Sequence, residues 1–257
     1  MTAQRIILVG LISFAMWGCK KSFPDQTPEQ LALQEDTYAA TAILSVEGLL
    51  NEMEFIVRQA PLQEKTESFL SCANISKQDI PEGYVIEITF ESKSLCSDSR
   101  YRSGKLRLTY NTITGNVLLQ PINYIIKETL ITGSYSFLNI TENQKNKTQI
   151  VVSNGKLSLY DGSFIKFNAN RKTSLQSAGL THGINDDIIQ IEKASCDLEL
   201  DNNTRIEAEN RSPLILKYDC DDKFRPRAGT IWLERASGAP RIIDFGTGNC
   251  SDRPTLL

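Results

Sequence analysis

The sequence predicts a mainly β protein: a long antiparallel meander sheet, curled, with one N-terminal amphipathic helix packed on it. Three observations indicate this fold class. Apolar residues follow a helical period between residues 37 and 60, the period changes to two beyond about residue 70, and short turn motifs separate the later apolar runs. Short links between neighbouring strands force antiparallel pairing, so the strands are expected to follow one another across the sheet.

Residues 1–18 are predicted to be a lipoprotein signal peptide. Arg5 gives the segment a basic start, and Ile6 to Trp17 form an uncharged apolar stretch, shorter than the ~20 residues that a helix needs to span a bilayer. This combination is typical of an export signal that is removed from the mature protein.

Cys19 is the predicted site of lipid attachment. It follows Gly18 as the modified cysteine of a lipoprotein follows a small residue, although residues 16–17 depart from the usual pattern and ordinary cleavage after Ser13–Ala15 is the alternative. Acyl chains such as palmitate on Cys19 would anchor the protein in a membrane, because each buried methylene contributes about 0.8 kcal/mol. Lys20 stands where aspartate would retain a lipoprotein in the inner membrane, so we expect the outer membrane, with the periplasmic face favoured over the cell surface.

Residues 19–35 are predicted to be a flexible tether between the lipid and the folded domain. They are mostly polar, contain two prolines, and show no apolar period before Leu31. The folded domain is therefore expected to cover residues 36–257, as a β-rich domain that begins with the helix.

The helix is predicted from Thr37 to Ala60. Asp36 or Thr37 can cap its first turn, and Pro61 ends it. Its apolar residues recur at alternating spacings of four and three, which places them on one stripe that we expect to face the sheet. The stripe consists of Ala39, Ile43, Val46, Leu50, Met53 and Val57.

Strand-like runs with a period of two follow the helix. Asn154-Gly155 and Asp161-Gly162 have the composition of tight hairpin turns, and Thr114–Asn116 and Asp201–Asn203 are further predicted turns. Pro121 cannot donate a ladder hydrogen bond, so its strand is expected to lie at an edge or to bulge there. The predicted strands are 83–91, 104–110, 116–126, 130–140, 148–153, 156–160, 163–169, 187–199, 204–209, 213–219, 229–235 and 241–246.

Five cysteines besides Cys19 can form two disulfides in an exported protein, with one thiol left over. We predict the first pair between Cys72 and Cys96. A hairpin that turns at residues 81–83 places Cys72 opposite the end of its partner strand, and the loop after that strand can return Cys96 to it.

Cys220 with Cys250 is the predicted second pair, which leaves Cys196 as a buried free thiol in a strand. The two cysteines leave strands 213–219 and 241–246 at the same edge of the sheet, and the loop before Cys250 gives the slack that a bond needs. The separation of Cys196 from Cys220 equals that of the first pair, so a duplicated module with a Cys196–Cys220 bond is the alternative, although the residues between the cysteines align poorly.

Four segments together resemble a group of uncharacterised lipoproteins of the Bacteroidota: QEDTYAATAILSVEGLLNEM, CSDSRYRSGKLRLTY, LYDGSFIKFNANRKTS and DCDDKFRPRAGTIWLERASGAPRIIDFGTGNCSD. The similarity covers nearly all of the chain after the signal peptide. It implies a β-rich envelope lipoprotein of unknown biochemical role, with cysteines that match Cys220 and Cys250. The chain differs from the group at Cys196, where a small or polar residue is usual, and at its end, where the group continues into one more strand. An edge strand is therefore expected to be unpaired, or covered by Leu256 and Leu257.

Composition and motifs predict no enzyme, cofactor, metal site or nucleic-acid partner. Removing residues 1–18 takes away one of 28 basic side chains, so 27 remain against 31 acidic ones, and a net charge of −4 is unlike that of a general nucleic-acid binder. The one histidine, His182, lies in a glycine-containing turn without a nucleophile motif. Asp186-Asp187 and Asp221-Asp222 lack the spacing of a calcium loop. Paired carboxylates distant in sequence leave a glycosidase as a further alternative.

Two basic loops and one tryptophan are the candidate partner contacts. RYRSGKLR contains Arg100 and Arg102, and KFRPR contains Arg225 and Arg227. Such loops could meet anionic glycans or lipid headgroups, although runs of this kind are more often solvated. Trp232 shares its strand face with polar neighbours, which indicates a sugar or protein contact unless the ring packs beneath the helix or a loop.

The leading hypothesis is a lipid-anchored cell-envelope protein that acts as a non-catalytic structural or partner-binding module. Its expected partners are the membrane, through acylated Cys19, and an envelope glycan, lipid or protein. The alternative is a carrier or chaperone of a lipid or other apolar ligand, held in a curled, half-barrel-like sheet with the helix as its lid. Strand 116–126 is apolar on both faces, as a lined pocket requires, whereas its neighbours are more one-sided.

Overall fold

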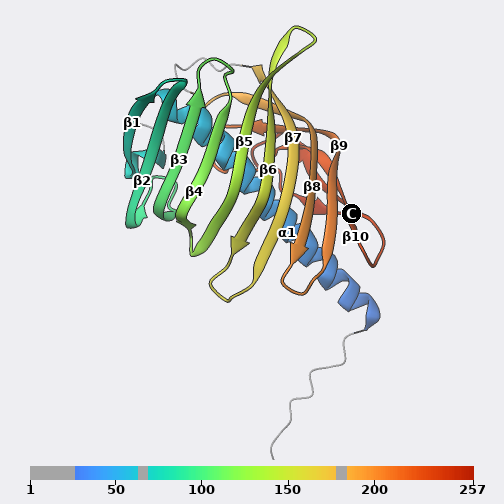
Figure 1. The fold of residues 1–257 in the computed structure, drawn as a ribbon. Coiled ribbons are helices and arrows are strands. Elements are labelled where there is room, and N and C mark those ends of the chain that lie inside the picture. The colour runs from blue at the N-terminus through green and yellow to red at the C-terminus, as the bar shows by residue number, and fades with distance from the viewer. Residues whose placement is uncertain (1–26, 63–68, 178–183) are drawn as a thin grey trace, which may run out of the picture.

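One curled sheet wraps around a single long helix, α1 (Pro28–Gln59), in the computed structural model (Figure 1). The structure describes residues 27–62, 69–177 and 184–257. In this part of the chain the sheet has twelve strands in chain order, and every neighbouring pair is antiparallel. The strands are β1 (Asn74–Ile80), β2 (Gly83–Leu95), β3 (Tyr101–Asn111), β4 (Val117–Ile126), β5 (Thr129–Glu142), β6 (Lys145–Ser158), β7 (Phe164–Ser177), β8 (Ile188–Leu200), β9 (Arg205–Lys217), β10 (Ala228–Arg235), β11 (Arg241–Thr247) and β12 (Thr255–Leu256).

The predicted fold class is confirmed. The sheet is a meander with β1 and β12 at its two edges, and these strands are not paired with each other, so the sheet stays open. The helix crosses its concave side diagonally (Figure 1). All six residues of the predicted apolar stripe are buried, and they pack into one core with the inward side chains of the strands. Because burial of a side chain such as Leu or Ile contributes about 1.5–3 kcal/mol, this contact is a large part of the driving force that bends the sheet around the helix.

The helix begins at Pro28, well before the predicted start near Thr37. Thr27 and Gln30 form a capping box: the Thr27 hydroxyl accepts the backbone N–H of Gln30 at 3.3 Å, and the Gln30 side chain accepts that of Thr27 at 3.0 Å. Pro28 occupies the first helical position, where its missing N–H costs nothing. The predicted tether is therefore wrong for residues 28–35, which are helical.

The predicted cap at Asp36 or Thr37 is wrong for the same reason. Asp36 lies inside α1 and its side chain is buried, with ion-pair partners on the sheet. The other end agrees with the prediction, because the α-helix stops at Gln59 and passes into a 3-10 turn, η1 (Ala60–Leu62), that contains Pro61. A second 3-10 turn, η2 (Phe69–Cys72), leads into β1.

The predicted hairpin turn at Asn154-Gly155 is wrong, because β6 runs through it as one strand. Its pairing with β7 shifts between Val152 and Gly155, which marks a bulge rather than a turn. A side chain at Gly155 would stand 2.5 Å from the ring of Phe167, so the glycine makes room for this ring. In the same way β9 is one strand where two were predicted, and its pairing with β10 shifts around Ser212.

The turns predicted at 114–116, 161–162 and 201–203 all connect neighbouring strands. Pro121 does not lie at an edge, because β4 is flanked by β3 and β5; instead the β4–β5 pairing is interrupted between Leu119 and Tyr124, which is the predicted bulge. Leu256 in β12 pairs with Ile243 in β11, and the backbones of Leu257 and Ile242 exchange two hydrogen bonds. The end of the chain therefore covers part of the β11 edge.

Both predicted disulfides are present. Cys72 bonds to Cys96, with 5.0 Å between their Cα atoms, and Cys220 bonds to Cys250 across 5.3 Å. Cys196 is a buried free thiol in β8, so the alternative Cys196–Cys220 bond of a duplicated module is not formed. The first disulfide fastens the turn before β1 to the end of β2, and the second fastens the loop after β9 to the loop after β11.

Candidate functional site

Two of the predicted partner contacts, Arg102 and Arg227, are wrong, because each side chain lies inside the protein and is only 1% exposed. Arg227 donates to the backbone carbonyls of Cys250 at 2.8 Å and Asp222 at 2.7 Å. It thereby holds the loop after β9 against the loop that carries the second disulfide. Its role is to fix these two loops, and it cannot meet a partner at the surface.

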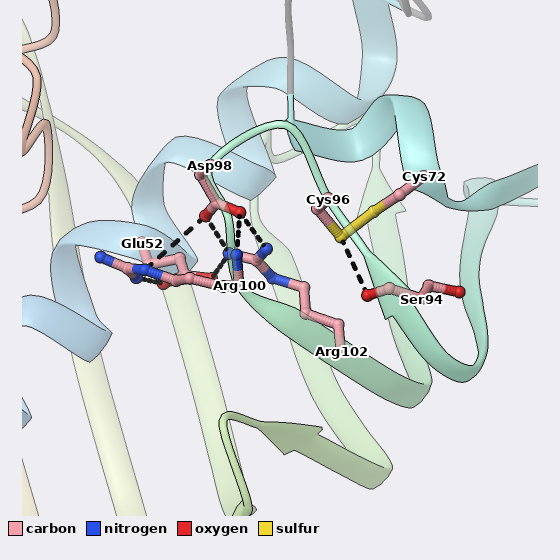
Figure 2. A network of polar contacts seen from close by, with 7 residues as sticks. All are labelled: Glu52, Cys72, Ser94, Cys96, Asp98, Arg100 and Arg102. Carbon is pink, nitrogen blue, oxygen red and sulfur yellow. Dashed lines mark hydrogen bonds and ion pairs between the residues drawn. A yellow bond between two sulfur atoms is a disulfide. The ribbon is translucent and has the colours of Figure 1, made fainter.

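Arg102 belongs to a buried ion network that joins α1 to the start of β3 (Figure 2). It donates to Glu52 on the helix at 2.7 Å and to both carboxylate oxygens of Asp98, each at 2.7 Å. Arg100 pairs with Glu52 at 2.8 Å and approaches Asp98 at 3.7 Å. The Cys72–Cys96 disulfide lies beside this network and fixes the start of the loop that carries Asp98.

The network shifts the acid–base properties of its members. Burial alone would raise the pKa of Asp98, but the hydrogen bonds and charges of Arg102 and Arg100 outweigh it and hold that pKa below its ordinary value. Burial and the nearby Glu52 carboxylate strongly raise the pKa of the Tyr124 hydroxyl, which stays protonated. Asp98 is therefore an anion and Arg102 a cation, and their charges compensate each other inside the fold.

A second buried network occupies the middle of the helix. Arg171 on β7 pairs with Glu47 at 3.3 Å and Glu54 at 3.6 Å and donates to Asn51, while the hydroxyl of Thr173 donates to Glu54 at 2.7 Å. Burial raises the pKa of Glu47, and the attraction of Arg171 offsets only part of this rise. These polar groups therefore form a specific joint between helix and sheet within an otherwise apolar contact.

A third network fixes the first turns of the helix. Arg235 on β10 pairs with Asp36 and Glu35, and Arg241 on β11 donates to Asp36 at 2.6 Å. The three networks use the buried acidic side chains of α1, which are Asp36, Glu47, Glu52 and Glu54. Because removal of one partner would leave a buried charge without compensation, they select one position of the helix on the sheet.

The loop after β9 packs against α1. Asn51 donates to the carbonyl of Phe224 at 2.8 Å, and the ring of Phe55 makes edge contacts with Phe224 and Tyr218, at 5.6 and 5.0 Å between centroids. The Arg100 guanidinium lies over the Phe224 ring at 5.4 Å. The helix is therefore held by the sheet and by this loop.

Arg100 and Arg225, the two remaining predicted contacts from the basic loops, line a cavity of about 450 Å³ beside this contact. We call it the helix-side cavity. It lies between the middle of α1, the β4–β5 turn region and the loop after β9, and such a volume is within the ~300–1,000 Å³ range of small-molecule sites. Its lining residues are Leu44, Ser45, Gly48, Leu49, Glu52, Arg100, Ile126, Lys127, Thr129, Ile131, Leu157, Asp222, Phe224, Arg225, Pro226 and Pro254.

Trp232 lies on the outer face of the sheet, as the sequence predicts. Its neighbours Ile231 and Leu233 are buried in the core, whereas Trp232 is half-buried and pairs across the strands with exposed Glu209 and with Ile242, which is 37% exposed. The Arg211 guanidinium covers the indole at 4.5 Å. We call Trp232, Glu209, Arg211 and Ile242 the tryptophan patch. It combines an aromatic ring, a cation and an aliphatic side chain at one accessible place.

The other candidates of the sequence do not converge on a site in the described part of the chain. Cys19 and His182 lie outside the described residues. Asp187 is buried and its carbonyl accepts the backbone N–H of Tyr218, whereas Asp222 pairs with Arg225 at 3.6 Å. Asp219 lies near Cys220 and Cys250, but the sulfur atoms of both are joined in the disulfide and do not act as thiolate ligands.

Sequence reasoning missed the inward acids of the helix and the cavity at Gly48. The signal was present for the acids, because Glu47 and Glu54 each lie next to a residue of the apolar stripe and Arg171 alternates with the core residues Phe167 and Ala169. Gly48 carries no such signal, since a glycine within a helical pattern does not tell which elements face it.

Comparisons with known proteins provide no information on function, so the helix-side cavity and the tryptophan patch are the two candidate sites. No family model matches the chain, and no curated protein and no solved structure is significantly similar to it. Within the described residues, no helix combines the length and the apolar character needed to cross a bilayer.

Proposed function

We propose that this protein is a non-catalytic module of the cell envelope, anchored through acylated Cys19 to the outer membrane at its periplasmic face, that binds a partner through the tryptophan patch. The observation that carries the binding role is the outward Trp232, flanked by Arg211 and by exposed Ile242. Tryptophan and arginine are the residue types enriched at interface hot spots, and an aliphatic neighbour can extend the contact.

Two features support an extracytoplasmic location. The folded domain holds two disulfides, which persist in oxidising compartments such as the periplasm. The sequence before the helix contains the apolar run and the Gly18-Cys19 pair of a lipoprotein signal. With residues 1–18 removed, eight residues, 20–27, would separate the lipid on Cys19 from the first residue of the helix, so the domain would lie within about 30 Å of the membrane surface.

Metabolic labelling with a clickable fatty acid tests the anchor. We expect the protein to take up label and to sediment with outer membranes, and Cys19→Ala to lose both properties. Cys196→Ser is the matched control, because it also removes a cysteine outside the disulfides but leaves the attachment site intact. An unlabelled parent protein, or equal labelling of Cys19→Ala, would refute the anchor.

Site-specific photo-crosslinking in intact cells tests the tryptophan patch. A photoreactive amino acid at position 242 should give a discrete protein adduct, whereas one at the exposed edge position 76 should not. Trp232→Ala should abolish the adduct while leaving the urea unfolding midpoint almost unchanged, because the ring is only half-buried. An adduct that persists in Trp232→Ala contradicts the proposed surface.

A carrier of an apolar ligand is the second candidate function, and the helix-side cavity favours it. The concave face of the sheet is covered by α1 through the buried core and the three ion networks. A ligand would therefore need an apolar site outside this contact. The cavity between α1, the β4–β5 region and the loop after β9 is such a site.

A further inference from the structure

We propose that the helix-side cavity binds the acyl chain of a single-chain amphiphile with an anionic head, with the chain against Gly48 and the head at Lys127 and Arg225. This inference rests on the second candidate function, that of a carrier, and gives it a ligand class and an orientation. It follows from the lining of the cavity, from the empty space at one glycine and from the distribution of charge.

The walls of the cavity are mostly apolar and come from three separate parts of the chain. The helix contributes Leu44 and Leu49, the sheet contributes Ile131 and Leu157, and the loop after β9 contributes Phe224. Except for the half-buried Leu44, these side chains are buried and belong to the core, so the inner wall is rigid. A rigid, mostly apolar lining suits an alkyl chain, which gains from every methylene that leaves water.

Gly48 gives the cavity its depth on the helix side. It is the one glycine of α1, and a Cβ placed there would meet no atom within 4 Å apart from its chain neighbours and the nearby backbone of the helix itself. Packing therefore does not require this glycine, although glycine within a helix costs about 1 kcal/mol relative to alanine. The cost is understandable if the open space has an occupant. Ser45, one turn earlier on the same face, also lines the cavity, and its small side chain fills little of the space.

The charges around the cavity favour an anionic ligand. Three cations and two anions line it, and Glu52 is already bound by Arg100 and, from behind, by Arg102. Lys127 forms no ion pair in the described part of the chain.

Arg225 also lines the cavity and has donor capacity to spare. It holds Asp222 at only 3.6 Å, and its buried Nε has no hydrogen-bond partner among the described residues. A guanidinium with free donors recognises a carboxylate or a phosphate through two parallel hydrogen bonds. An anionic head bound between Arg225 and Lys127 would compensate both positive charges.

A photoreactive palmitic acid, with a diazirine in its chain, tests the site on the full-length protein held in an amphiphilic polymer. We expect saturable labelling of peptides that contain residues 44–49 and 126–131. Gly48→Leu should raise the half-saturating concentration by about tenfold or more, because its side chain enters the cavity. Thr37→Leu is the matched control, since it adds the same side chain at an exposed position of the same helix and should change labelling less than twofold.

A second set of variants tests the position of the anionic head. Lys127→Gln with Arg225→Gln should weaken labelling by palmitate about three- to tenfold and leave competition by uncharged hexadecanol unchanged. Unlabelled palmitate and palmitoyl lysophosphatidylglycerol, used as competitors, distinguish a free fatty acid from a phospholipid source. Equal effects of the charge variants on palmitate and on hexadecanol would overturn the anionic head.

The labelling experiment distinguishes a wrong binding site from a wrong carrier function. Saturable labelling that maps to other peptides, or that Gly48→Leu leaves unchanged, overturns the helix-side cavity as the site while a carrier function stands. Absence of saturable labelling overturns both. Circular dichroism of Gly48→Leu confirms that its fold is intact, as expected because leucine is the better helix former.

Discussion

Replacement of Arg102 by methionine tests whether buried ion pairs hold the helix in the sheet. The Arg102 side chain is fully buried, Glu52 is 2% exposed, and three hydrogen bonds of 2.7 Å connect Arg102 to Glu52 and Asp98. Breaking a buried pair by removing one partner costs about 3–5 kcal/mol, because the other charge stays buried. Arg100 still contacts Glu52 at 2.8 Å in the variant, so we expect the lower end of this range, about 3 kcal/mol.

Lys105→Met on the same strand is the matched control. Lys105 pairs with Glu87 at the same distance, 2.7 Å, but their side chains are 35% and 33% exposed. Pairs in contact with solvent contribute about 0–1 kcal/mol, because water screens the charges and competes for the hydrogen bonds. The comparison therefore sets a buried network with three hydrogen bonds against a half-exposed single pair on the same strand, at the same pair distance.

Urea unfolding with both disulfides intact is the assay. For a chain of this size a slope of about 2–3 kcal/mol per molar urea is expected, so Arg102→Met should lower the midpoint by about 1–1.5 M and Lys105→Met by less than about 0.5 M. In the double variant Glu52→Gln/Arg102→Met, the loss should be smaller than the sum of the single losses by at least about 1 kcal/mol. Equal midpoints for Arg102→Met and Lys105→Met would refute the reasoning.

Three further predictions concern the cysteines and the response to acid. Burial raises the pKa of the Cys196 thiol, so N-ethylmaleimide at pH 8 should modify it only in urea; fast modification of the folded protein would contradict its burial. Joint replacement of Cys220 and Cys250 by serine should lower the free energy of unfolding by about 2–5 kcal/mol, measured by urea titration, because the loop is no longer restrained in the unfolded chain. The pKa of Asp98 is lowered in the folded state, so its stabilising contribution is complete above the unfolded value of about 3.9 and is lost as the pH falls through the folded value. The difference in stability between the parent and Asp98→Asn should therefore be largest at neutral pH and shrink below about pH 4, and a difference that grows in acid would contradict this sign.

Local patterns in the sequence were sufficient for much of the fold. The stripe of α1 and most tight turns follow from residue spacing. The Cys72–Cys96 disulfide follows from hairpin geometry, and the Cys220–Cys250 disulfide follows from two strands that end at the same edge of the sheet. The pattern failed at Asn154-Gly155, because the composition of a hairpin turn is the same as that of this bulge. What decides between them is the ring of Phe167 on the next strand, and no local pattern contains this contact.

Arg102 and Arg227, which were predicted to lie at the surface, show a different limit of prediction from sequence. Alternation along β3 places Arg102 on the same face as the buried Leu106 and Leu108, so the sequence did contain its inward direction. The basic cluster was nevertheless interpreted as a surface loop. A buried charge needs a partner, and the partner of Arg102 is Glu52, which lies 50 residues away and is not visible in the local pattern. The cavity could not be predicted for the same reason, since its lining comes from three separate segments.

The contact between Asp36 and Arg235 has a consequence for the order of assembly. These residues are 199 positions apart, and Arg241 joins the same carboxylate from still farther along the chain. Because a polypeptide is synthesised from its N-terminus, the amphipathic segment of α1 is made long before the strands that enclose it. Contacts of such long range also slow folding. Until the last strands form, this segment therefore exposes apolar surface that can make non-native contacts.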